Sequence, residues 1–239
     1  MSGSWRGLVG IIKPTRGSGS LEELIRMLPE GIGVIPLFNN IKHGKIEEFR
    51  AALSQYEHKI AELSEDKVDV IHAAGTPPFM LLGYRGEQEL IEKWEKQYKI
   101  PIFTSGTNQI SALRALKIKK FVGAGYDFED TTIVANYFTD AGFEVQSIER
   151  IPVPWEDVGK LSSRVVYSLI KKAFLKHPGA EGIYFQGGKL RILDIVEELE
   201  QDLQVPVVHP VAAECWEIQK RLHVRQPRTG YGRLLAEMP

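Results

Sequence analysis

A short apolar run, "GIYFQ" at residues 182–186, ends in a glutamine that is followed at once by Gly187 and Gly188. A helical pattern over residues 189–202 predicts that the two glycines begin a helix. The free backbone N–H groups and positive dipole end of a helix can bind a carboxylate. Close packing of the helix on the strand would explain the same glycines. This turn is therefore one candidate anion site.

Two further strand ends carry groups that bind carboxylates. In "AAGTPP", Gly75 and Thr76 can bring backbone and a hydroxyl close to a small anion, although a tight turn requires the same residue types. Tyr126 follows the run "KFVGAG" and offers a phenol as hydrogen-bond donor, although a packed tyrosine is the commoner role for such a position. The three turns together predict a pocket for a small acid.

Other polar residues near strand ends are weaker candidates. His72 and His209 occupy similar places in the two halves of the chain, but no further ligand at a suitable spacing accompanies them, so we predict no metal site. Lys189 can pair with an acidic ligand. Cys215, the only cysteine, lies in an amphipathic helical pattern, which favours a small buried residue over a nucleophile.

The elements that must position these residues alternate between short Val- and Ile-rich runs and longer helical segments, a pattern typical of parallel sheets covered by helices. The sequence predicts eight strands, at residues 7–13, 32–38, 68–74, 100–105, 120–126, 143–151, 182–186 and 205–209. The longest helix is expected over about 45–64.

The segments that begin "VDVIHAAGTPP" and "AEGIYFQGGKL" share one plan of strand, glycine turn, charged helix, strand and helix. We therefore predict an α/β protein with two pseudo-symmetric domains, each a four-stranded parallel sheet flanked by helices. The expected domains are 1–116 with the C-terminal tail 217–239, and 117–216. Ligands of open parallel sheets bind beyond the carboxyl ends of the strands, so a cleft between the domains is expected there. Its lining would come from "KPTRGSG", which includes Pro14, and from "AAGTPP", "GAGYDFED" and "FQGGK".

Composition excludes several classes of partner. Thirty Lys and Arg balance 31 Asp and Glu, which gives a net charge of -1 and no electrostatic basis for binding nucleic acid or an anionic membrane. No apolar run is long enough to span a bilayer, and the start of the chain lacks the pattern of a secretion signal. A single cysteine fits a reducing compartment, so a cytoplasmic location is expected. A homo-oligomer is left open.

The duplicated plan, "AAGT", "GAGYD", "FQGGKLRILDIVEELEQDLQVPVV" and the closing "RTGYGRLL" resemble the aspartate/glutamate/hydantoin racemase superfamily, in the branch of arylmalonate decarboxylase and maleate isomerase. The resemblance covers nearly the whole chain. It implies a shared cleft between two parallel-sheet domains, with no organic cofactor and no metal.

The resemblance also implies a cysteine after the third strand of one or both halves. The first of these positions matches Gly75, as in the decarboxylase, and the second matches Gln186 in "FQGG". A carboxamide has no accessible pKa and cannot act as acid, base or nucleophile, although it can hold a substrate or a water. Two-cysteine racemisation and thiolate addition to a double bond are therefore disfavoured.

These residues predict a cofactor-independent, decarboxylase-like enzyme that acts on a small malonate-like acid. An enolate-type intermediate is expected in the pocket of Thr76, Tyr126 and Gly187. The proton donor is undetermined; the candidates are a water held by Gln186, then His209, then Lys189. The alternatives are a small-carboxylate-binding relative without turnover, and a maleate isomerase or racemase that uses Cys215. The predicted site residues are Gln186, Tyr126, Thr76, Gly75, Gly187, Gly188, Pro14, His209 and Lys189.

Overall fold

The computed structural model describes residues 3–17, 19–126, 130 and 132–239. It contains eight strands among these residues, one at each place where the sequence predicts one. Six of them are shorter than predicted by one to three residues, at one end or both. The strands are β1 (Gly7–Lys13), β2 (Ile32–Phe38), β3 (Val70–Ala73), β4 (Ile102–Thr104), β5 (Lys120–Gly125), β6 (Glu144–Arg150), β7 (Gly182–Phe185) and β8 (Val207–Val208).

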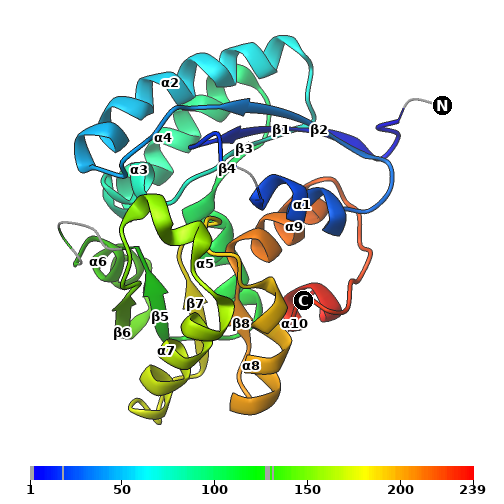
Figure 1. The fold of residues 1–239 in the computed structure, drawn as a ribbon. Helices are drawn as coiled ribbons and strands as arrows, with labels where there is room; N and C mark the ends of the chain where they lie inside the picture. Colours follow the sequence, from blue (N-terminus) through cyan, green and yellow to red (C-terminus); the bar gives the residue numbers. More distant parts are fainter. Residues whose placement is uncertain (1–2, 18, 127–129, 131) are drawn as a thin grey trace.

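The strands form two parallel sheets with the same internal order. The first runs β2-β1-β3-β4 and the second runs β6-β5-β7-β8. The central strands are almost fully buried, as sheets covered on both faces require. Figure 1 shows the first sheet in the upper half of the molecule and the second in the lower half. The predicted duplication and α/β fold are confirmed.

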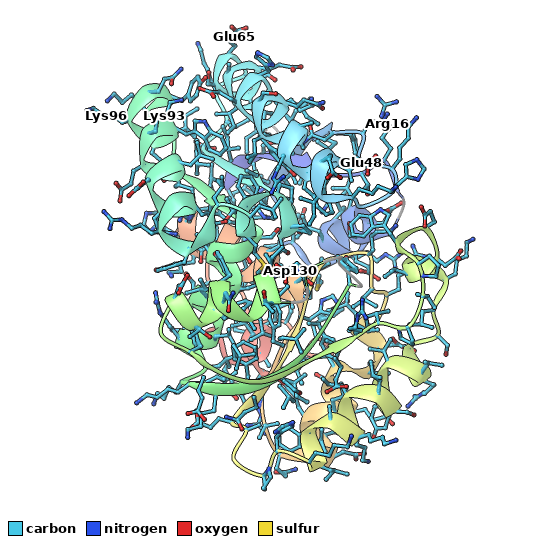
Figure 2. The ribbon with its side chains drawn as sticks, turned by 90° about the vertical axis from the view of Figure 1, so that its left-hand side faces the viewer. Arg16, Glu48, Glu65, Lys93, Lys96 and Asp130 are labelled. Atoms are coloured by element: carbon cyan, nitrogen blue, oxygen red, sulfur yellow. The ribbon has the colours of Figure 1, made fainter. Side chains whose placement is uncertain are left out.

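Helices cover both faces of each sheet (Figure 1). Their apolar stripes face the strands, while most of their charged residues face outward; Figure 2 shows Lys93 and Lys96 pointing away from the body of the protein. The α-helices are α1 (Ser20–Met27), α2 (Ile46–Glu65), α3 (Pro77–Met80), α4 (Gly83–Tyr98), α5 (Ser105–Ala115), α6 (Thr132–Asp140), α7 (Ser163–Leu175), α8 (Val196–Leu203), α9 (Pro210–Arg221) and α10 (Arg233–Glu237). Two 3₁₀ helices, η1 (Trp155–Lys160) and η2 (Leu193–Ile195), complete the described elements.

Several contacts join the halves. Helix α9 follows the last strand of the second sheet and packs against α1 and α5 of the first half. On the other side, buried Glu87 of α4 accepts hydrogen bonds from Thr104 Oγ1, at 2.7 Å, and from the Tyr137 hydroxyl of α6. Burial raises the pKa of Glu87 to about 7. The halves therefore share a packed interface, and the predicted domain limits remain a prediction.

The helix predicted for residues 189–202 is wrong at its start. Residues 188–192 form a turn and a bend, η2 covers Leu193–Ile195, and α8 begins only at Val196. Leu190 and Ile192, two positions apart, are both buried in the core, a spacing that a helix face does not provide. Gly187 and Gly188 therefore do not begin a helix, and the proposed carboxylate site at its dipole does not exist.

No helix among the described residues is both long and apolar enough to cross a membrane.

Candidate active site

A cavity of about 60 Å³ lies at the carboxyl ends of the strands of both sheets. One water molecule needs about 10–15 Å³ of such space, so the cavity holds a small molecule of several non-hydrogen atoms. Its walls come from the residues that follow β1, β3, β4, β5, β7 and β8, as the switch-point rule for parallel sheets requires. The lining is Lys13, Pro14, Thr15, Ser20, Phe49, Ala74, Gly75, Thr76, Pro77, Pro78, Ser105, Tyr126, Trp155, Gly187, Gly188, Lys189, Pro210, Val211 and Glu214.

The turn after β3 places Thr76 in the wall of this cavity. Gly75 has a φ of +115°, which lets the chain bend sharply before Pro77 starts α3. Thr76 is 1% exposed, and its Oγ1 has no hydrogen-bond partner within the described part of the chain. A buried, unpaired hydroxyl is costly unless a ligand or water meets it. Thr76 is therefore the polar group that most needs a ligand in this cavity.

The opposite wall is built around Tyr126. The backbone N–H of Lys189 donates to the Tyr126 hydroxyl at 3.1 Å, and the ring of Trp155 packs edge-on at a centroid distance of 4.7 Å. Burial raises the pKa of the Tyr126 phenol well above its usual value, so the phenol keeps its proton. Gly187, at φ +80°, lies directly against this hydroxyl, and a Cβ there would overlap it. Tyr126 is therefore held rigidly as a neutral donor.

Lys189 lines the cavity, but its ammonium group is engaged with Trp155. Its Nζ donates to the Trp155 carbonyl oxygen at 2.5 Å and lies 4.5 Å from the centre of the Trp155 ring. Burial lowers the pKa of Lys189. Trp155 in turn packs against Phe49 of α2 at 5.8 Å, so the two halves of the protein meet over the cavity.

Gln186 does not line this cavity. Its Oε1 accepts from the Tyr126 backbone N–H at 3.3 Å, and its Nε2 points to Met80 Sδ at 3.7 Å. The fully buried side chain instead borders a smaller apolar cavity of about 10 Å³, with Met80 and Leu81 in the same wall. The amide at the position of the family cysteine thus fixes the backbone of Tyr126.

His209 also lies outside the cavity lining. It precedes α9 as its capping residue, and its Nδ1 accepts from the Val211 N–H at 3.2 Å. Burial lowers the pKa of His209 to about 3, so the imidazole is neutral at ordinary pH. The His209 side chain therefore caps the helix and is not in the protonated form that a general acid needs.

We expect His209→Asn to flatten the pH dependence of stability. Between pH 6.5 and 3 an unfolded histidine binds a proton that folded His209 does not, so wild-type stability falls by up to about 1.4 kcal/mol per pH unit from this residue. Asparagine retains the helix cap without titrating. Denaturant unfolding at a series of pH values measures the difference between the two proteins. Parallel curves from pH 6.5 to 4 would contradict the assignment.

Sequence reasoning missed a buried polar network beside the cavity. Glu214 Oε1 lies 2.8 Å from His72 Nδ1, and Glu214 Oε2 lies 3.4 Å from Lys13 Nζ. Burial alone would raise the pKa of Glu214, but Lys13 and His72 hold it at about 2. His72 Nε2 lies 3.2 Å from Ser105 Oγ, which also accepts from the Gly75 N–H at 2.9 Å.

Cys215 faces away from the cavity. It is fully buried in α9, where Gln219 Nε2 points to its Sγ at 3.7 Å, and burial raises its thiol pKa to about 12. A thiol in this state is a poor nucleophile. Within the described residues, no group of three or more His, Cys, Asp or Glu side chains is arranged to hold a metal ion.

The cavity thus brings together most of the predicted residues. Seven of them line it, namely Thr76, Tyr126, Gly75, Gly187, Gly188, Pro14 and Lys189. Gln186 and His209 lie behind its walls. Residues 18 and 127–129 of the predicted lining stretches fall outside the described residues. The chemical roles of all these side chains remain proposals.

Two parallel sheets of the same order, with a cavity at their carboxyl ends, make this an α/β protein with two similar halves. The sequence profile of arylmalonate decarboxylase matches residues 14–235. The chain belongs to the arylmalonate decarboxylase family, which confirms the resemblance seen in its sequence.

Individual relatives agree with this assignment. Maleate isomerase of Pseudomonas putida strain KT2440 is 29% identical over 120 residues, which cover 48% of this chain and 48% of that protein. The match thus spans about half the length of this curated relative.

Solved structures show the same fold. Maleate isomerase Iso of Pseudomonas putida S16 has a TM-score of 0.87 at 20% identity, over 98% of this chain and 99% of that one. Maleate cis-trans isomerase of Nocardia farcinica has 0.88 at 18% identity, over 97% and 98%. Arylmalonate decarboxylase has 0.81 at 22% identity, over 95% and 98%.

Proposed function

We propose that this protein is a cofactor-independent decarboxylase that acts on a small, malonate-like dicarboxylic acid. The observation that carries the proposal is Thr76, which lines the same small cavity as Tyr126 and whose buried hydroxyl has no partner among the described residues. Membership of the arylmalonate decarboxylase family supports the same chemistry.

The reaction needs donors more than it needs a charged catalyst. When the bond to the departing carboxylate breaks, its electron pair moves onto the α-carbon and into the remaining carboxylate, giving an enolate-type intermediate. Fixed hydrogen-bond donors in a water-poor cavity stabilise such a developing charge strongly. Thr76 and the protonated Tyr126 phenol both line the cavity, and on this proposal they are the donors.

A maleate isomerase function is less favoured than a decarboxylase function. Thiolate addition to a double bond needs a reactive cysteine, and the only cysteine of the chain lies outside the cavity with a raised pKa. One observation favours a binding protein without turnover as a second candidate. Gln186, at the family's cysteine position, has no titratable group and turns toward Met80.

Carbon-13 NMR with carboxyl-labelled acids distinguishes these functions. We expect label from malonate and methylmalonate to appear as carbon dioxide and bicarbonate, more slowly from phenylmalonate because the cavity is small, while maleate stays unchanged. Conversion of maleate to fumarate would indicate the isomerase. Calorimetric binding of malonate, with every acid unchanged after hours, would indicate the binding protein.

Thr76→Val should separate activity from stability. Valine has nearly the same shape and removes only the hydroxyl, which no described residue pairs, so we expect the free energy of unfolding to change by less than about 1 kcal/mol. Loss of a donor to the intermediate should lower kcat by about 10²–10³. Steady-state kinetics and urea unfolding of the same preparations measure both. An active Thr76→Val protein would remove the hydroxyl from the mechanism.

A further inference from the structure

A serine, a histidine and a glutamate form a connected line that ends at the cavity. Ser105 Oγ lies 3.2 Å from His72 Nε2, and His72 Nδ1 lies 2.8 Å from Glu214 Oε1. These distances are those of hydrogen bonds between a hydroxyl, an imidazole and a carboxylate. The same order of groups activates hydroxyls in enzymes with unrelated folds.

The imidazole is held in one orientation. His72 is 1% exposed on β3, and its ring stacks on Phe103 of β4 at a centroid distance of 4.4 Å and an interplanar angle of 6°. The Glu214 carboxylate, which stays ionised beside Lys13, accepts a hydrogen bond from the Nδ1–H. Nε2 is thereby directed to Ser105.

Ser105 connects this line to the site. It is the first residue of α5, is only partly buried and lines the cavity, whereas His72 behind it does not. The Gly75 N–H donates to Ser105 Oγ at 2.9 Å, so the hydroxyl lies beside the turn that carries Thr76. A backbone donor at this position stabilises negative charge on Oγ.

The three proton donors suggested by the sequence are worse placed. Gln186 and His209 do not line the cavity, and Lys189 Nζ is engaged with the Trp155 carbonyl. We propose that Ser105 is the proton-transfer residue of this site. His72 and Glu214 are positioning residues, and His72 returns a proton to Ser105 after each transfer. The proposal rests on the decarboxylase function proposed above.

The proton transfer balances without a cofactor. With His72 protonated on both nitrogens, Nε2–H donates to Ser105 Oγ, and the Ser105 hydroxyl proton is directed to the cavity. After carbon dioxide leaves, the α-carbon of the enolate forms a C–H bond with that proton. Ser105 takes the Nε2 proton of His72, which becomes neutral, and Glu214 remains a carboxylate. Water returns one proton to His72 before the next turnover, and the hydroxide left behind combines with the released carbon dioxide to give bicarbonate.

Covalent labelling tests the line without any substrate. In the neutral form of His72, Nε2 can accept the Ser105 proton, so Ser105 Oγ should attack methanesulfonyl fluoride. An S–O bond forms, the S–F bond breaks, and fluoride leaves. We expect mass spectrometry to find one methanesulfonyl group on Ser105 of the folded protein, at least tenfold less on His72→Gln, and none on Ser168, an exposed serine whose hydroxyl donates to the Arg164 carbonyl. An unlabelled Ser105 in folded wild-type protein would overturn the proposal.

Turnover tests the role of Ser105 in the reaction. We expect Ser105→Ala to lower kcat for methylmalonate by about 10²–10⁴ with KM changed less than threefold, and Ser105→Cys to recover part of the loss because a thiol also donates a proton. If His72→Gln does not fold, Glu214→Gln replaces it in both assays. Ser105→Ala with wild-type kcat would overturn the proposal while leaving the decarboxylase intact. If Ser105 is labelled but no acid is decarboxylated, the decarboxylase fails and the activated serine stands.

Discussion

Lys13→Met should lower the free energy of unfolding by about 3–5 kcal/mol, because it leaves the buried Glu214 carboxylate without its cation. For a chain of this size the melting temperature should fall by roughly 6–20 °C. Differential scanning calorimetry and urea unfolding measure the change. The double variant Lys13→Met/Glu214→Gln removes both charges and should recover more than half of the loss.

An exposed ion pair provides the matched control for Lys13→Met. Lys93 of α4 lies 3.2 Å from Glu57 of α2, with both side chains partly in solvent, and Figure 2 shows Lys93 on the outer surface. Lys93→Met should cost less than about 1 kcal/mol. Equal effects of Lys13→Met and Lys93→Met would show that Glu214 is not buried in solution.

Gly187→Ala should abolish most of the activity by displacing Tyr126. Gly187 has a φ of +80°, and an added Cβ would overlap the Tyr126 hydroxyl, which must then leave the cavity wall. Loss of one donor to the intermediate lowers kcat by about 10²–10³. The rate of carbon dioxide release from methylmalonate measures the loss.

Gly142→Ala is the matched control for Gly187→Ala. Gly142 has a φ of +91°, but nothing lies within 4 Å of an added Cβ. The left-handed backbone costs both variants about 1–2 kcal/mol of stability, whereas only Gly187→Ala should change kcat. If both variants keep wild-type kcat, Tyr126 has no part in the reaction.

The fold could be predicted from sequence because its signals are local. Each strand is a short apolar run closed by a turn, and the two halves repeat one order of elements, which fixes two similar sheets. The start of the helix after Gly188 was predicted wrongly because "KLRILDIVEEL" fits both an alternating and a helical pattern of apolar residues. Leu190 and Ile192 are both buried, and the segment forms a turn and a bend before η2 and α8 begin.

The turns after β3, β5 and β7 were predictable by the same logic, since ligands bind where parallel strands end. The network of Lys13, His72, Ser105 and Glu214 was not. His72 and Glu214 are 142 residues apart, and only the return of α9 to the first half brings them together. One local signal existed: Glu214 is a charged residue inside the apolar segment "VAAECW", where a carboxylate needs a buried partner.

Gln186 has a clearer meaning in the structure than in the sequence. The amide accepts from the Tyr126 N–H and fills space beside Gly125, so the residue at the expected second cysteine position supports the cavity wall from behind. The first position, Gly75, lies against Ser105 Oγ instead. On our proposal, proton transfer in this protein depends on a hydroxyl of the first half.

Release of carbon dioxide from carboxyl-labelled methylmalonate tests the proposed site most directly. Wild-type protein and Thr76→Val, matched in stability, are compared with the spontaneous rate in the same buffer. We predict release by wild type far above the spontaneous rate, and a loss of about 10²–10³ in Thr76→Val. Spontaneous rates from both proteins, or equal rates from the two, would contradict a decarboxylase built around this cavity.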